Sequence, residues 1–170
     1  MGIKGSRKKV KKPMLTTSEM EVAIARHFNI RTHIIIPNLS WGFFNHECDL
    51  FLIRKTGYGF EIEIKRSKSD MLADFKKKHG HIDRQNRIVQ LYYAFPIELL
   101  PKVEELVPEE CGIITVNRYG EHIHASLHKE AKRKTGAKPL TDKEILKITR
   151  LGCMRIWSLK DKLNKLKKKF

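Results

Sequence analysis

The sequence predicts an α/β fold in which helices flank a mixed central β-sheet. Apolar and charged residues alternate strictly over residues 60–65, which is typical of a strand with one face in the core. Residues 88–95 are apolar on both faces, as expected of an internal strand. Helical segments are expected over 16–28, 67–78 and 97–107, and their alternation with the strands favours a mixed sheet.

The chain begins with a basic arm. Residues 1–14 carry six cationic side chains and little apolar surface, so they either contact phosphate or act as a solubilising tail. The first helix carries Glu19 and Glu21 in its first turn, where either carboxylate also favours the helix N-terminus. A strand is expected over 30–37. Trp41 follows in a loop, where it could stack on a base or cover the end of the sheet.

Residues 47–65 have the pattern of a β-hairpin around a glycine-bearing turn. On its second strand Glu61, Glu63 and Lys65 share the face opposite the apolar residues. Asp49, at the start of the first strand, should return alongside the end of the second, so that it converges with Glu63 and Lys65. Two carboxylates there would offer hard oxygen ligands to Mg²⁺, whereas an exposed face would be only a solvated edge.

The next helix, over 67–78, should turn Met71, Leu72 and Phe75 inward and its lysines outward. The outward lysines are Lys68, Lys76, Lys77 and Lys78. Beside a metal site we expect them to bind phosphate; otherwise they form an ordinary solvated face.

Further strands are expected over 111–116 and 122–128, the second with a row of histidines on an exposed edge. A capping box at 141–144 then begins a C-terminal helix with apolar residues at near-heptad spacing, which Gly152 should break or kink. This helix either docks on the core or pairs with a second copy of the chain to form a homodimer.

Length and charge narrow the class of protein. The 170 residues fit one core over 15–130, extended over 131–170 by a basic linker and the amphipathic C-terminal helix. A net charge of +16 favours a polyanion, and nucleic acid is preferred to a membrane because no segment has the apolar length or the broad apolar face that a membrane requires. The three cysteines match no zinc spacing or disulfide framework, which favours the cytoplasm.

The pattern D-x(n)-E-x-K on a hairpin resembles the PD-(D/E)XK nuclease superfamily. The run from Glu63 to Asp74, EIKRSKSDMLAD, is similar to the E-I-K-S-S-x-x-D-F-x-x-D run of MmcB-like DNA repair proteins. Residues 91–96 and 108–116 resemble the next two strands of that family. The likeness covers roughly residues 45–130. Cys48 stands where the superfamily motif has proline.

This resemblance implies a restriction-endonuclease-like core, αβββαβ, and a Mg²⁺- or Mn²⁺-dependent deoxyribonuclease acting on DNA in repair or recombination. It implies that Asp49 and Glu63 bind the metal and that Lys65 serves the attacking water. Either Glu19 or Glu21 would add a carboxylate from the first helix. Two other functions stay open at this stage: a catalytically inactive DNA-binding module, and an RNA-processing nuclease.

Overall fold

The computed structural model describes residues 14–39, 46–75 and 86–168 of the chain. Its strands are β1 (Ile34–Leu39), β2 (Cys48–Ile53), β3 (Gly59–Ile64), β4 (Ile88–Pro96), β5 (Gly112–Tyr119) and β6 (His122–Lys129). Its α-helices are α1 (Thr17–His27), α2 (Lys68–Phe75), α3 (Leu100–Val103) and α4 (Asp142–Lys167). Two short 3₁₀ turns, Ile97–Leu99 and Glu104–Leu106, flank α3.

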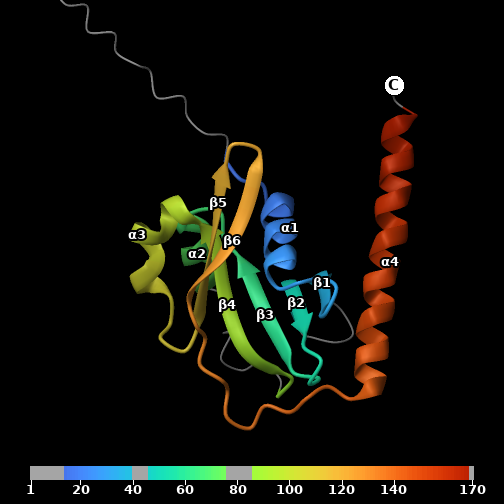
Figure 1. The fold of residues 1–170 in the computed structure, drawn as a ribbon, viewed down its shortest axis with the longest axis horizontal. Coiled ribbons are helices and arrows are strands. Elements are labelled where there is room, and N and C mark those ends of the chain that lie inside the picture. The colour runs from blue at the N-terminus through green and yellow to red at the C-terminus, as the bar shows by residue number, and fades with distance from the viewer. Residues whose placement is uncertain (1–13, 40–45, 76–85, 169–170) are drawn as a thin grey trace, which may run out of the picture.

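The strands form one six-stranded sheet in the order β1-β2-β3-β4-β5-β6 (Figure 1). The β3–β4 and β4–β5 pairs are parallel, and the other three pairs are antiparallel. A parallel pair needs a crossover, and α2 and α3 lie in these two crossovers. The predicted α/β fold with a mixed sheet flanked by helices is therefore confirmed.

Each face of the sheet has its own apolar layer. On one face, Met20 and Ile24 of α1 pack on Leu52 and Ile62. On the other face, α2 and α3 pack around Tyr93, and α4 covers β1 and β2. The alternation of β3 produces this division, because neighbouring residues of a strand point to opposite faces.

Three local expectations were wrong. The first strand begins at Ile34 rather than Ile30, because the chain first turns at Asn29, whose φ is 58°. The segment 97–107 is helical but divided, because the four-residue α3 lies between two 3₁₀ turns instead of extending into one continuous helix. Gly152 does not interrupt α4; a Cβ there would lie 3.1 Å from Ile36 Cγ1, so the glycine permits a close approach to β1.

The predicted C-terminal helix is confirmed as α4, and its buried contacts with the sheet come from its first half. Ile148 is buried against β1 and β2, whereas every residue from Cys153 to Lys168 is exposed. Within the described ranges, no helix has the length and hydropathy needed to cross a membrane.

Candidate active site

The β2–β3 hairpin brings Asp49 and Glu63 together at the end of β3. Leu50 pairs with Ile62, so the antiparallel register continues to Asp49 beside Glu63. Asp49 Oδ2 accepts a hydrogen bond of 2.7 Å from the backbone N–H of Ile64. Burial, and then the charge of Glu63, raise the pKa of Asp49 from 3.8 to about 6. The two carboxylates are therefore close enough to repel each other.

Lys65 provides the positive charge of the site. Its Nζ lies 2.9 Å from Glu63 Oε2 and 3.1 Å from Asp74 Oδ1. Burial alone would lower the pKa of Lys65, but the charges of Glu63 and Asp74 and hydrogen bonds to both raise it above its usual value. Lys65 is thus a fixed ammonium group at neutral pH, able to donate hydrogen bonds and unable to act as a base.

Asp74 belongs to the site although sequence reasoning assigned it no role. It is 2 % exposed and also accepts a 3.4 Å hydrogen bond from the Tyr93 hydroxyl. The Ser67 hydroxyl accepts from the backbone N–H of Asp70 at the start of α2, which then carries Asp74 back over Lys65. The inward side of α2 holds Met71 and Asp74, while Leu72, expected to face inward, is 39 % exposed. The signal in the sequence was Asp74 three residues after Met71, on the same side of the helix.

Glu21 and Glu19 lie on different sides of α1. Burial, and then the charge of Asp49, raise the pKa of Glu21, and a side-chain hydrogen bond with Asn38 opposes this. Glu19 instead accepts a 2.6 Å hydrogen bond from Arg118 and forms the capping box with Thr16. Of the two glutamates that the sequence left open, Glu21 therefore faces the Asp49 site and Glu19 does not.

Glu61 shares the face of Glu63, as the alternation of β3 requires, and it is fully buried. Its Oε1 lies 2.9 Å from His46 Nε2, and no spacing in the sequence predicts this pair. This pair supports the base of the hairpin, since buried carboxylates need a polar partner.

The residues expected to bind phosphate are only partly described. Lys68 is exposed on the first turn of α2, beside the strand end that carries Lys65. Trp41 and the lysines at 76–78 lie outside the described residues.

The charges at the site fit a divalent cation. Asp49, Glu63 and Asp74 lie around one lysine, and Glu21 and Asp70 add further negative charge near Asp49. No group of three His, Cys, Asp or Glu side chains in the described part of the chain could hold a metal by itself. Mg²⁺ does not need such a cage, because it commonly binds one or two carboxylates and takes its other ligands from water and phosphate. Asp49 and Glu63 could hold such an ion.

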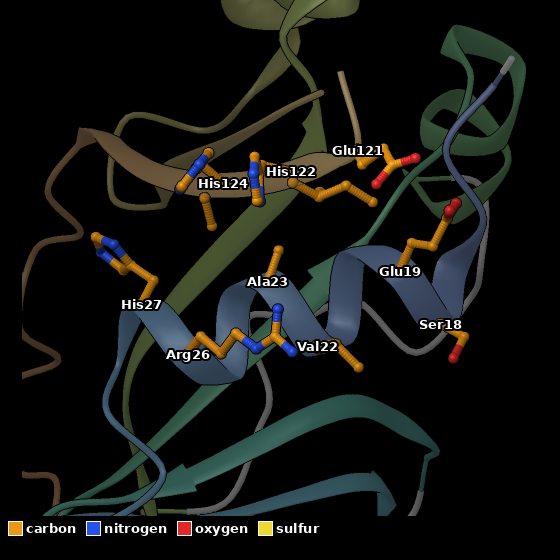
Figure 2. Close-up of a pocket in the computed structure, with 11 residues that line it drawn as sticks. Ser18, Glu19, Val22, Ala23, Arg26, His27, Glu121, His122 and His124 are labelled. Atoms are coloured by element: carbon orange, nitrogen blue, oxygen red, sulfur yellow. The ribbon is translucent and has the colours of Figure 1, made fainter. Parts of the chain in front are cut away.

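A hollow lies on the other side of α1, facing β6. It has a volume of about 540 Å³, and its walls include Glu19, His27, His122 and His124 (Figure 2). The histidines of β6 are exposed on the edge strand, as expected. The hollow is lined by α1 and β6 and does not include Asp49, Glu63 or Lys65.

No family model matches this chain, and neither does any curated protein. The chain is similar to a solved structure, the SPO1766 protein of unknown function from Silicibacter pomeroyi. The two share 20 % sequence identity and superpose with a TM-score of 0.63, over 89 % of this chain and 94 % of that one. At this identity the similarity shows a shared fold and leaves the activity to be argued from the site.

Proposed function

We propose that this chain is a metal-dependent deoxyribonuclease of the PD-(D/E)XK type, which hydrolyses phosphodiester bonds of DNA in repair or recombination. One observation carries the proposal: Lys65, buried between Glu63 and Asp74, lies at the strand end where Asp49 and Glu63 repel each other. A buried charge network at the end of a sheet costs stability, so it favours a functional explanation.

The order of elements supports the same proposal. The chain runs α1-β1-β2-β3-α2-β4, which is the αβββαβ order of a restriction-endonuclease-like core. The proposed site lies where β2 begins and β3 ends, and α2 leaves β3 directly over it.

Asp49 and Glu63 are the proposed ligands of Mg²⁺ or Mn²⁺, and Glu21 is a neighbouring carboxylate that could bind a metal-bound water. When bound, the ion would supply a Lewis acid that polarises the phosphate and lowers the pKa of a bound water. The Ile64 N–H fixes one oxygen of Asp49, so this carboxylate is oriented before any ion arrives.

In the proposed reaction a water oxygen attacks phosphorus and the bond from phosphorus to one sugar oxygen breaks. The attacking water gives up a proton to solvent, and the leaving sugar oxygen takes a proton from solvent. Negative charge grows on the phosphate oxygens as the bond forms. Lys65 is already protonated, so it stabilises that charge or orients the water by donating a hydrogen bond. Asp74 and Tyr93 are positioning residues, because they act through the ammonium group of Lys65.

A nucleic acid is the proposed partner because the chain carries a net charge of +16. Such an excess attracts any polyanion, so the choice of DNA over RNA rests on the resemblance to the DNA repair family. The local acidity of the site does not oppose this, because a bound divalent ion would neutralise it.

The test is a cleavage assay with Mg²⁺ or Mn²⁺ on single-stranded, duplex, nicked and branched DNA, with a matched RNA. We expect metal-dependent cleavage of DNA that Asp49→Ala and Glu63→Ala abolish and that the exposed control Glu47→Gln retains. DNA binding without cleavage on every substrate would favour the inactive binding module. Preferential cleavage of RNA would favour the RNA-processing nuclease.

A further inference from the structure

The second half of α4 has a surface that the proposed reaction does not use. The first half docks through Ile145, Ile148 and Leu151, and Gly152 lies against Ile36. Beyond Gly152 the helix continues with its side chains in solvent. A helix that continues for four turns without one buried side chain needs a reason, since packing supplies most helix stability in proteins.

This half of α4 projects from the end of the sheet that carries the candidate site. Arg155 donates a hydrogen bond to the carbonyl oxygen of Asn38, and Ser158 and Leu39 line one hollow. Leu39 pairs with Cys48, the residue before Asp49. The helix therefore reaches the strand end near Ser158, and its remaining nine residues extend about 14 Å further. Figure 1 shows α4 (orange to red) continuing well past β1 in this direction.

The projecting part is strongly basic. Its lysines are Lys160, Lys162, Lys165, Lys167 and Lys168, all exposed, and its one acidic residue is Asp161. Asp161 pairs with Lys165 at 2.7 Å, and both side chains are more than half exposed, so this pair adds little stability. Five lysines against one aspartate leave a local charge of +4.

An aromatic ring accompanies this charge. Trp157 is 68 % exposed, and Lys160 Nζ lies 4.9 Å from the centroid of its ring. Trp157, Lys160, Asn164 and Lys168 follow one another at offsets of three, seven and eleven residues, so they share one side of the helix. An exposed ring beside lysines is the combination that single-stranded nucleic acid uses, with the base stacked and the phosphates paired.

The apolar side of the same segment argues against two other partners. Ile156, Leu159 and Leu163 continue the line of Ile145 and Gly152, which face the domain. A flat membrane that touched this stripe would collide with the sheet. A second copy of α4 would bring like charges together, because lysines border the stripe on both sides.

We propose that residues 157–168, the distal arm, bind the phosphate backbone of DNA beside the candidate site, with Trp157 stacked on an unpaired base. The substrate class is then DNA with unpaired bases, such as a single strand, a gap or a flap. The choice of DNA rests on the proposed function, while the arm itself rests on the direction, charge and exposed ring of α4.

The test measures DNA binding without cleavage, in the presence of EDTA, by the fluorescence anisotropy of a labelled single strand and its duplex. The arm variant combines Lys160→Gln, Lys165→Gln and Lys168→Gln. The control variant removes the same charge with Lys55→Gln, Lys138→Gln and Lys143→Gln. These three lysines are exposed around the β2–β3 turn and the start of α4, where Leu140 donates to the carbonyl oxygen of Gly57.

We expect the arm variant to weaken single-strand binding at least about tenfold at low salt, and to reduce the slope of log K against log salt by about two. The control variant should stay within about threefold of wild type. Trp157→Ala should weaken single-strand binding about five- to hundredfold and change duplex binding much less.

Equal losses in the arm and control variants, or unchanged single-strand binding by Trp157→Ala, would overturn the proposal. The proposal would also be overturned if the arm variant lost binding to anionic phosphatidylglycerol vesicles but kept DNA binding. That result would assign the arm to a lipid surface. The two proposals fail separately: if the arm variant loses binding while no preparation cleaves, the arm stands and the nuclease does not. If Asp49→Ala abolishes cleavage while the arm variant binds normally, the nuclease stands and the arm does not.

Discussion

The two sides of α1 shift the pKa of a glutamate in opposite directions. Glu19 and Glu21 are two residues apart, yet the pKa of Glu19 falls to about 2 while that of Glu21 rises above 4.5. On the side facing β6, the Thr16 backbone N–H and the Arg118 guanidinium compensate the charge of Glu19. On the side facing β2, burial and Asp49 oppose the charge of Glu21.

This difference separates a structural ion pair from the proposed cation site. The β6 side gains stability from its charges as they stand, because opposite charges lower the free energy of the folded state. On the β2 side, carboxylates that repel one another destabilise the folded state. Among the described residues, Lys65 is their one close cation. Functional sites characteristically keep such destabilising charges.

The largest effect should come from Lys65, which is common to the repulsive network and the proposed chemistry. We expect Lys65→Met to reduce the cleavage rate at least about a hundredfold. Since it also leaves Glu63 and Asp74 buried without their cation, we expect a loss of about 3–5 kcal/mol in the free energy of unfolding. Single-turnover cleavage and urea denaturation measure the two effects.

Lys65→Arg serves as the second variant, because it keeps the positive charge and should fold when Lys65→Met does not. Its guanidinium cannot occupy the same position, so cleavage should still be slow while stability is largely kept. Wild-type cleavage by a folded Lys65→Met protein would mean that the reaction does not use this site.

Asp49→Asn should stabilise the metal-free protein. Because the pKa of Asp49 rises from 3.8 to about 6 on folding, its ionised form destabilises the folded state fully above pH 6. The penalty shrinks as pH falls from 6 and is absent below 3.8, where the side chain is protonated in both states. Above pH 6 we therefore expect the variant to be more stable by about 1–3 kcal/mol.

Thermal denaturation in EDTA across this pH range measures the effect, and the exposed Glu47→Gln is the matched control. A stability gain that was as large below pH 3.8 as above pH 6 would show that repulsion of the ionised group is not its cause.

Glu19→Gln should have the smallest effect and the opposite sign. A lowered pKa means that the ionised Glu19 stabilises the folded state, fully above pH 4.5 and less as pH falls toward 2. The variant should therefore melt slightly below wild type at neutral pH, and the difference should shrink as pH falls from 4.5 through 2. The exposed Glu105→Gln serves as the control and should show no such convergence. Equal melting temperatures of wild type and Glu19→Gln at neutral pH would show that the ion pair of Glu19 with Arg118 does not stabilise the fold.

The sequence was sufficient for the features that depend on local spacing. The alternation of β3 fixed which residues share the face of Glu63, and the short turn before it placed Asp49 near that strand's end. The mixed sheet could be predicted because β4 is apolar on both faces and helices alternate with the strands around it.

Features that depend on long-range packing were missed. Arg118, which fixes the role of Glu19, lies 99 residues from it in the chain, and no sequence spacing reveals such a pair. Asp74 was missed because the packing of α2 against the sheet decides whether Leu72 or Asp74 faces inward. Sequence periodicity favours the apolar residue, whereas the buried ammonium of Lys65 favours the carboxylate.

We propose that the Asp49 side of α1 holds a cation and that the Glu19 side does not. Calorimetric titration of Mg²⁺ or Mn²⁺ into wild-type protein, Asp49→Asn, Glu21→Gln and Glu19→Gln tests this difference. We expect binding by wild type and Glu19→Gln, weakened binding by Glu21→Gln, and none by Asp49→Asn. Equal binding by wild type and Asp49→Asn would contradict the claim.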